Sequence, residues 1–370
     1  MSTPTAINAS ISVKKELVTA EKRRNPPGPN EPIPFGRIPS NHMFVCDFVP
    51  EKGGWQPPEI VPYHNFDFSP IAVVFHYGQE IFEGMKAYRP ENTGSKSFYL
   101  FRPEQNAQRM YNSALRLGME PVPVNLFLKA VEELVKVDAE WIPDAPGSLY
   151  IRPTLIPLDE GVSYRASTAY RFFVCLTPAR NYYSKETGVS VYIEREIVRA
   201  APGGTGATKC GGNYAAALPG LNKAKKLGAE QVLWLDAINH RYVEEVGAMN
   251  IMFVYEDCIV TPPLSGTILP GVTRSSIIEL ARSLGYTVKE ERIDINQAIA
   301  DAQSGKLKEV FGCGTAAVIS PVDAFMDADR TIAINNREIG KVSTHLKNAL
   351  MDIQFGKAKD PFGWRKTVEF

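Results

Sequence analysis

Apolar positions recur at two different spacings along the chain, which predicts both helices and strands. Between Val124 and Val135 an apolar residue stands at nearly every third or fourth position, the spacing of an amphipathic helix. A second helix is predicted to begin at Pro103, because proline is favoured in a first helical turn. Runs rich in Tyr, Ile, Leu, Phe and Val are typical of strands. In the first half of the chain these runs are 43–48, 71–75, 97–101, 148–155 and 171–176.

The same alternation starts again after residue 188, which indicates a second domain. Residues 177–188 lack periodicity and contain Pro and Gly, as linkers do. Five prolines between residues 24 and 34 predict an extended segment. We therefore expect an extended tail (1–34), a small domain (35–178), a linker (179–188) and a larger domain (189–370). In the larger domain the predicted strands are 189–193, 231–235, 250–255 and 309–311, and the predicted helices are 214–227, 274–284, 295–303 and 341–353.

Composition and charge limit the classes of function. The 370 residues contain 41 Lys and Arg against 41 Asp and Glu, with no long block of like charge, so a nucleic-acid or anionic-membrane binder is not expected. No apolar run approaches the ~18 residues of a membrane-spanning helix. Five cysteines without CxxC spacing, and no secretory signal, indicate a reducing compartment. We expect a cytoplasmic protein that binds small molecules.

The least ordinary segment is 202–214, in which five glycines surround Lys209. A phosphate-binding P-loop is excluded because Cys210 stands where its Ser or Thr belongs, and a dinucleotide fingerprint is excluded because Lys209 takes its third glycine position. The chain contains no HExxH, no zinc-like Cys/His spacing and no GxSxG, so no metal site is predicted. Two interpretations of Lys209 stay open from this context alone: a solvated loop lysine, or an amine that forms a Schiff base.

Seven motifs, in this order along the chain, resemble those of the branched-chain-amino-acid aminotransferases. This family consists of fold-type IV enzymes that depend on pyridoxal 5′-phosphate (PLP). The resemblance runs from about residue 35 to the C-terminus. It rests on HYGQEIFEGMKAY (76–88), LYIRP (149–153), KCGGNY (209–214), QVLWL (231–235), EVGAMNI (245–251), LPGVTR (269–274) and EVFGCGTA (309–316).

The resemblance implies a fold, a reaction and a cofactor site. The fold is mixed α/β, with a smaller N-terminal domain and a larger, β-barrel-like C-terminal domain surrounded by helices. The implied reaction is ping-pong transfer of the amino group of Leu, Ile or Val to 2-oxoglutarate by a homodimer. Lys209 is implied as the lysine that forms the Schiff base and moves the substrate proton. Glu245 is implied as the partner of the pyridine nitrogen, and neighbouring Glu244 is the competing assignment. The other implied cofactor ligands are Tyr214 at the phenolic oxygen and Arg109, Val272, Thr273 and Thr315 at the phosphate.

The resemblance also implies a substrate pocket. Aromatic walls suit branched aliphatic side chains, and an arginine beside them suits the γ-carboxylate of glutamate. The implied pocket residues are Phe35, Tyr77, Tyr150, Arg152 and Tyr182, with Tyr77 from the partner subunit and the amides of Thr315 and Ala316 at the α-carboxylate.

The chain departs from the family pattern at one point. Mammalian members carry a redox CxxC after the Gly-Thr-Ala turn, where this chain has Ala317 and Ser320, so that switch cannot operate here; nearby Cys313 is expected to be a packing residue. The rival functions are a D-amino-acid transaminase or an aminodeoxychorismate lyase of the same fold, and a non-enzymatic ligand-binding protein.

Overall fold

The chain folds as two compact units. The computed structural model describes residues 11–28, 31–90, 96–180 and 188–370. The first unit combines the chain up to Tyr182 with two short segments, Thr208–Gly211 and Ile353–Phe370; the second contains Tyr183–Ala207 and Gly212–Asp352. The four residues around Lys209 therefore belong to the first unit, although the chain on both sides of them belongs to the second.

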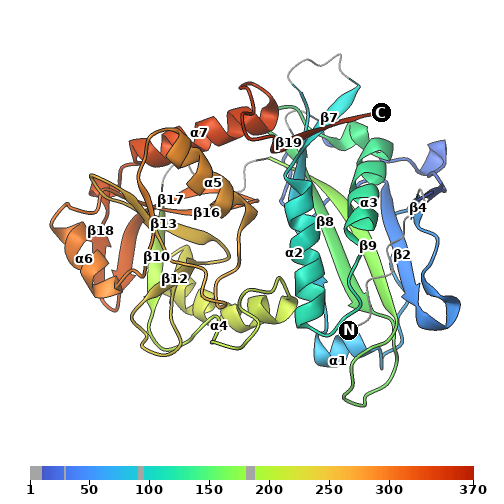
Figure 1. The fold of residues 1–370 in the computed structure, drawn as a ribbon, viewed down its shortest axis with the longest axis horizontal. Coiled ribbons are helices and arrows are strands. Elements are labelled where there is room, and N and C mark those ends of the chain that lie inside the picture. Colours follow the sequence, from blue (N-terminus) through green and yellow to red (C-terminus); the bar gives the residue numbers. More distant parts are fainter. Residues whose placement is uncertain (1–10, 29–30, 91–95, 181–187) are drawn as a thin grey trace. The chain divides into compact units, whose positions relative to one another are not determined.

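The first unit is built on a ten-stranded sheet (Figure 1). Its main path runs β1 (Lys14–Lys15), β4 (Glu59–Pro62), β2 (His42–Val49), β9 (Tyr170–Ala179), β8 (Ser148–Pro157), β6 (Met85–Tyr88), β7 (Ser97–Phe101) and β19 (Arg365–Glu369). Two short strands, β3 (Gly54–Trp55) and β5 (Ile81–Phe82), pair with β2 and β8. Every pairing is antiparallel except that of β1 with β4.

Two helices, α2 (Pro103–Arg116) and α3 (Val124–Val137), lie along this sheet (Figure 1). The buried residues of α3 recur at helical spacing, among them Phe127, Val131 and Leu134, and they join the same hydrophobic core as the central strands. The predicted helices and four of the five predicted strands in this part of the chain are confirmed.

The predicted strand at residues 71–75 is wrong, because the chain forms helix α1 (Val73–Tyr77) there. A run of five apolar residues does not distinguish a strand from a short helix. In the structure Ala72 and Val73 are buried while Phe75 is 62% exposed, and Gly78, at φ +57°, ends the helix. The sequence pattern therefore showed which residues are apolar, but it did not show whether they form a strand or a helix.

The second unit is built on a nine-stranded mixed sheet. Its path runs β12 (Val243–Val246), β11 (Gln231–Leu235), β10 (Val189–Glu194), β17 (Val318–Asp327), β16 (Glu309–Gly314), β13 (Asn250–Val254), β14 (Ile259–Thr261) and β15 (Val288–Glu290), and β18 (Arg330–Ala333) pairs with β17. The pairs β10–β11, β10–β17 and β14–β15 are parallel. The helices are α4 (Gly211–Lys226), α5 (Val272–Ser283), α6 (Ile295–Gln303) and α7 (Lys341–Phe355), and the four predicted strands and four predicted helices are confirmed.

The N-terminal segment from residue 11 to residue 28 belongs to the first unit and contacts its sheet. Beyond the β1–β4 pairing, the backbone N–H of Val18 donates to Nε2 of His42 (2.9 Å), and Nδ1 of His42 lies 2.7 Å from buried Asp138. Among the described residues no helix is long and apolar enough to span a membrane.

Candidate active site

Lys209 is held in the first unit by backbone hydrogen bonds to two elements. Its carbonyl accepts from the N–H of Phe82 on β5 (3.0 Å), and its own N–H donates to Oγ of Ser113 on α2 (3.2 Å). Ile81 and Cys210 form a β-bridge beside this contact. The ammonium nitrogen lies 4.9 Å from the centre of the Phe82 ring. The glycine-rich segment is thus fixed at Lys209 as an extra strand-like partner of β5.

The environment of Lys209 favours the neutral amine. Burial, followed by the positive charge of Arg109, lowers the pKa of Lys209 to about 8, although the carboxylate of Glu83 opposes the shift. An amine with that pKa is about one-tenth neutral at pH 7, against well under one-hundredth for an ordinary lysine. Lys209 is therefore equipped to act as a nucleophile and as a proton acceptor.

Arg109 forms a buried, two-pronged ion pair with Glu83. Its Nε and Nη2 lie 2.7 and 2.8 Å from the two carboxylate oxygens, and Asn106 donates to the same carboxylate (2.8 Å). Burial alone would raise the pKa of Glu83, but Arg109 lowers it below the ordinary value, so Glu83 is ionised. The arginine predicted to meet a phosphate is thus fixed in orientation by a residue that the sequence analysis did not single out.

Three of the predicted substrate residues lie together in the first unit. The rings of Phe35 and Tyr150 meet edge to face (4.9 Å), and Nη2 of Arg152 donates to the hydroxyl of Tyr150 (3.0 Å). The Arg152 guanidinium also lies over the ring of Phe82, at 4.7 Å. Within the described part of the chain Arg152 has no carboxylate partner in ion-pair range, and its Nε is buried without a hydrogen bond. This cation, set among aromatic rings, suits an anionic ligand.

The other two predicted pocket aromatics stand apart from this group. Tyr77 lies on α1, where its hydroxyl donates to the carbonyl of Val162 and its ring lies 5.5 Å from that of Tyr164. Tyr182 is outside the described residues.

In the second unit, Glu245 is a buried carboxylate surrounded by donors. Its Oε1 accepts from the backbone N–H of Leu269 (2.9 Å) and from the side chain of Asn250 (3.2 Å). Nε of Arg199 lies 3.1 Å from its Oε2, and both side chains are buried. A carboxylate bound in this way is stabilised in its ionised form.

Neighbouring Glu244 has a different environment. It accepts a hydrogen bond from the hydroxyl of Thr267, and burial raises its pKa above the ordinary value. Glu244 is the less suitable of the two for holding a protonated ring nitrogen, which requires a dependable negative charge. The geometry therefore favours Glu245, as the motif order did.

The predicted phosphate residues of the second unit lie at the start of α5 and in a turn of the sheet. Val272 and Thr273 open α5, where backbone N–H groups have no helical acceptor. Asn250 donates to the carbonyl of Leu269 (2.9 Å), which ties this helix start to strand β13. Thr315 and Ala316 form the turn between β16 and β17, and Cys313, just before that turn, pairs with Asn250 in the sheet. Tyr214 lies in the first turns of α4 and is partly exposed.

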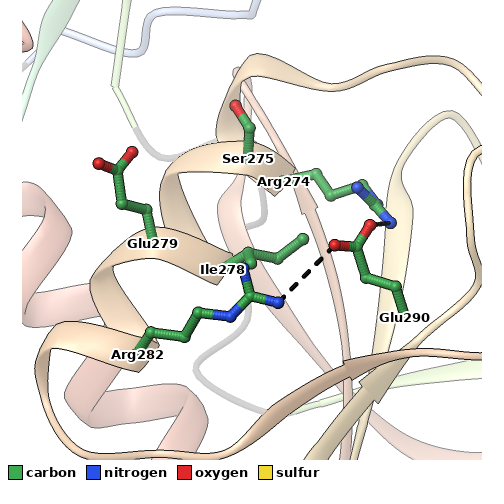
Figure 2. Close-up of a pocket in the computed structure, with 6 residues that line it drawn as sticks. All are labelled: Arg274, Ser275, Ile278, Glu279, Arg282 and Glu290. Carbon is green, nitrogen blue, oxygen red and sulfur yellow. Dashed lines mark hydrogen bonds and ion pairs between the residues drawn. The ribbon is translucent and has the colours of Figure 1, made fainter.

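A pocket beside α5 contains none of the predicted site residues, although Arg274 in its lining is the neighbour of Thr273. Figure 2 shows its two arginines turned toward Glu290; Arg274 lies 2.8 Å and Arg282 3.8 Å from that carboxylate. Arg274 also donates to the carbonyl of Pro262 (2.8 Å). With two arginines and two glutamates in its lining, the pocket has balanced charge, and the contacts of Arg274 tie the first turn of α5 to Glu290 and Pro262.

Comparison with known proteins decides the family. A model of the family described as amino-transferase class IV matches residues 80–325. "Branched-chain-amino-acid transaminase 1" of Bacillus subtilis (strain 168) is 45% identical over 367 residues, which cover 98% of this chain and 100% of that protein. The chain belongs to the class IV aminotransferases.

Solved class IV aminotransferase structures share the fold. The branched-chain amino acid aminotransferase of Escherichia coli is 25% identical, with a TM-score of 0.70 and coverage of 84% of this chain and 97% of that one. A branched-chain amino acid aminotransferase solved with pyridoxamine 5′-phosphate, from the organism abbreviated T.th., is 27% identical, with a TM-score of 0.73 and coverage of 89% of this chain and 99% of that one. The predicted family, aminotransferase activity and mixed α/β fold are confirmed.

Several residues of this aminotransferase contact the residues around Lys209 or Glu245, although the sequence did not predict them. They are Phe82, Glu83, Asn106 and Ser113 in the first unit and Arg199 and Asn250 in the second. Glu83 carried a usable signal, since it is a charged residue inside the otherwise apolar run 81–85. Gly84 carried another, because a Cβ there would stand 2.1 Å from the hydroxyl of Tyr150.

In the described part of this aminotransferase, neither Cys313 nor the acidic side chains form a second reactive or metal-binding site. Cys313 is buried, and burial raises the pKa of its thiol to about 12, so it is unreactive near neutral pH. Among the described residues no group of three or more His, Cys, Asp or Glu side chains could hold a metal ion.

We expect the Lys209 amine of the cofactor-free protein to react with a small acylating reagent along a pH profile with its midpoint near 8. Only the neutral amine attacks, so the rate should rise with pH and level off above the pKa of about 8, whereas ordinary lysines continue to gain reactivity toward pH 10.5. Mass spectrometry of the Lys209 peptide and of exposed Lys52 gives the comparison. Identical profiles at the two lysines would contradict the assignment.

Proposed function

We propose that the protein transfers the amino group of leucine, isoleucine or valine to 2-oxoglutarate in a PLP-dependent ping-pong reaction, giving branched-chain 2-oxo acids and L-glutamate. The observation that carries the proposal is Lys209 itself. It is a partly buried amine with a pKa of about 8, placed next to Arg109 and close to an aromatic group that contains an arginine without a carboxylate partner among the described residues. The relative that is 45% identical is named for the same activity.

In each unit, taken by itself, the residues present fit PLP. In the first unit Lys209 would bond the cofactor and Arg109 would meet its phosphate. In the second unit the N–H groups of Val272 and Thr273 and the hydroxyl of Thr315 would bind the phosphate, and Tyr214 the phenolic oxygen. The strongest test of fit is Glu245, whose buried charge is held by two hydrogen bonds and an ion pair with Arg199 and would keep a ring nitrogen protonated. When bound, PLP supplies an electron sink for the charge left on the substrate α-carbon.

The chain's own residues handle the proton and the substrate. With a pKa of about 8, Lys209 can accept the α-proton and return it near neutral pH. Phe35, Phe82 and Tyr150 provide aromatic surface for a branched aliphatic side chain. The amides of Thr315 and Ala316 would bind the α-carboxylate, and Tyr77 would reach the pocket from a partner subunit.

The rival reactions have less support. A D-amino-acid transaminase or an aminodeoxychorismate lyase would share the fold and Lys209, but the nearly full-length relatives at 42–45% identity carry the branched-chain name. A non-enzymatic ligand-binding protein has no need of an amine with a lowered pKa.

The direct test is to offer purified protein leucine, isoleucine, valine, D-alanine and aminodeoxychorismate, with 2-oxoglutarate as acceptor where one is needed. We expect glutamate formation with the three branched-chain L-amino acids, and its loss by several orders of magnitude in Lys209→Ala, because the amine performs both the bonding and the proton transfer. The matched control is Lys52→Ala, which removes an exposed lysine of the same unit. Turnover of D-alanine or aminodeoxychorismate in place of leucine would overturn the proposal.

We further propose that Arg152 binds the γ-carboxylate of glutamate and 2-oxoglutarate. The guanidinium has cation–π contacts with Phe82 and Tyr150 and one bond to the Tyr150 hydroxyl, and Nε is buried without a partner. A ligand carboxylate would satisfy this charge, while a leucine side chain would contact only the rings. One pocket could then accept both substrates in turn.

Replacing Arg152 with methionine should therefore weaken one half-reaction selectively. Loss of a charge-assisted contact corresponds to about a 10- to 100-fold lower rate with glutamate, with a much smaller change for leucine. Single-turnover rates measured separately for each amino acid give the ratio. Equal losses for the two substrates would show that Arg152 supports the site generally.

We propose that the protein is a cytoplasmic homodimer. Its five cysteines are all free, which suits a reducing compartment. An apolar patch on the first unit suits a second copy of the chain: α1 and the loop that follows Pro157 lie together through the bond from Gly161 N–H to the Ile71 carbonyl (2.8 Å). The exposed members of this patch are Ile71, Phe75, Tyr77, Val162 and Tyr164, the last 90% exposed. Such clusters are unusual on monomers.

Charges placed in this patch should separate the copies. We expect the wild-type protein to show twice the 40.9 kDa chain mass in light scattering, and the double variant Phe75→Glu, Tyr164→Glu to shift toward the single-chain mass. Ile238→Glu, which alters another exposed apolar side chain outside the patch, is the control and should leave the mass unchanged. A double variant with the wild-type mass would remove the patch from the interface.

A further inference from the structure

Glu83 is a buried carboxylate whose two oxygens both accept hydrogen bonds, yet the proposed function gives it no role in binding the cofactor or the substrate. It is 0% exposed, and its oxygens accept from Nε and Nη2 of Arg109, from Asn106 and from the N–H of Gly84. Replacing a buried ion pair with apolar residues is often neutral or stabilising. Stability alone is therefore a weak reason for a protein to keep this pair.

The position of Glu83 connects Arg109 with Lys209. Glu83 directly follows Phe82, whose N–H bonds the Lys209 carbonyl, and its own N–H donates to the carbonyl of Pro153 on β8 (2.8 Å). The carboxylate is thus fixed by the backbone on one side and by α2 on the other. Its charge acts on Lys209 in the direction opposite to that of Arg109.

We propose that Glu83 is a positioning residue with two effects: it orients the Arg109 guanidinium toward the cofactor phosphate, and it balances the Arg109 charge beside Lys209. The two-pronged contact occupies the Nε–Nη2 edge, which fixes the guanidinium plane and directs Nη1 away from Glu83. The inference rests on the proposed function, since it takes PLP as the cofactor.

The chain offers a matched control in the same sheet. Arg171 binds Asp47 with the same two-pronged geometry, at 2.8 and 2.8 Å, on strands β9 and β2. Asp47 is partly exposed, and within the described residues it has no hydrogen bond or ion pair with Lys209, Arg109 or Glu83. Asp47→Asn therefore reports what the loss of such a pair does to the fold without touching Arg109.

The first experiment measures equilibrium binding of PLP and of pyridoxal, which lacks the phosphate, to the full-length cofactor-free protein. Glu83→Gln should reduce the preference for PLP over pyridoxal by about 10- to 100-fold, the effect of one misplaced charge-assisted contact. Asp47→Asn should keep the wild-type preference even if its melting temperature falls. An unchanged preference in Glu83→Gln would overturn the inference, whereas a wild-type protein with no preference would overturn the proposed function beneath it.

The second readout is the pH profile of Lys209 acylation in the same proteins. Without the carboxylate, the charge of Arg109 acts on the ammonium uncompensated, so the midpoint should move to lower pH in Glu83→Gln and stay in place in Asp47→Asn. A purely structural role predicts no shift, and that result would count against the charge-balancing effect.

A milder variant keeps the inference testable if Glu83→Gln does not fold. Asn106→Ala removes one donor from the Glu83 carboxylate and leaves the arginine pair intact. It should reduce the preference for PLP in the same direction but by less. Wild-type preference for PLP over pyridoxal in this variant would overturn the inference.

Discussion

The chemistry proposed for this protein depends on the buried contact between Glu83 and Arg109. Two full charges next to a partly buried amine would each shift its protonation strongly, in opposite directions. Held 2.7–2.8 Å apart, they act on Lys209 in opposite directions, and burial is the largest influence on its pKa. The result is an amine poised near pH 8. The cost of burying both charges is offset by the two-pronged geometry and by the donation from Asn106.

Each unit uses backbone pairing to present its functional side chains. In the first unit, the four residues around Lys209 leave the second unit's chain path, and Lys209 and Cys210 pair with β5, the strand that directly precedes Glu83. In the second unit, the turn that follows β12 and the start of β13 place Glu245 and Asn250 together, and Asn250 in turn fixes the chain before α5. Arg109 and Glu245 thus lie on regular elements, helix α2 and strand β12.

In the described residues the sequence predicted six of the seven α-helices and eight of the nineteen strands, because the apolar residues of these elements follow a clear period, as α3 and β8 illustrate. It did not predict β12, whose two central residues are the charged Glu244 and Glu245 and therefore hide a fully buried strand. The family motifs indicated Lys209, Glu245 and the α5 start. They did not indicate the Arg109–Glu83 or Arg199–Glu245 pairs, because pairs distant in sequence form only when the strands and helices have packed. Tyr77 shows the same limit, because only the structure placed it beside Tyr164.

The central claim is that Lys209 is the lysine that bonds the cofactor. Borohydride reduction of the purified, PLP-loaded protein converts that bond into a stable one, which peptide mass spectrometry can then locate. The account predicts a phosphopyridoxyl group on the peptide that contains Lys209, and none on that peptide in Lys209→Ala. A wild-type protein modified at a different lysine, with Lys209 unmodified, would contradict it.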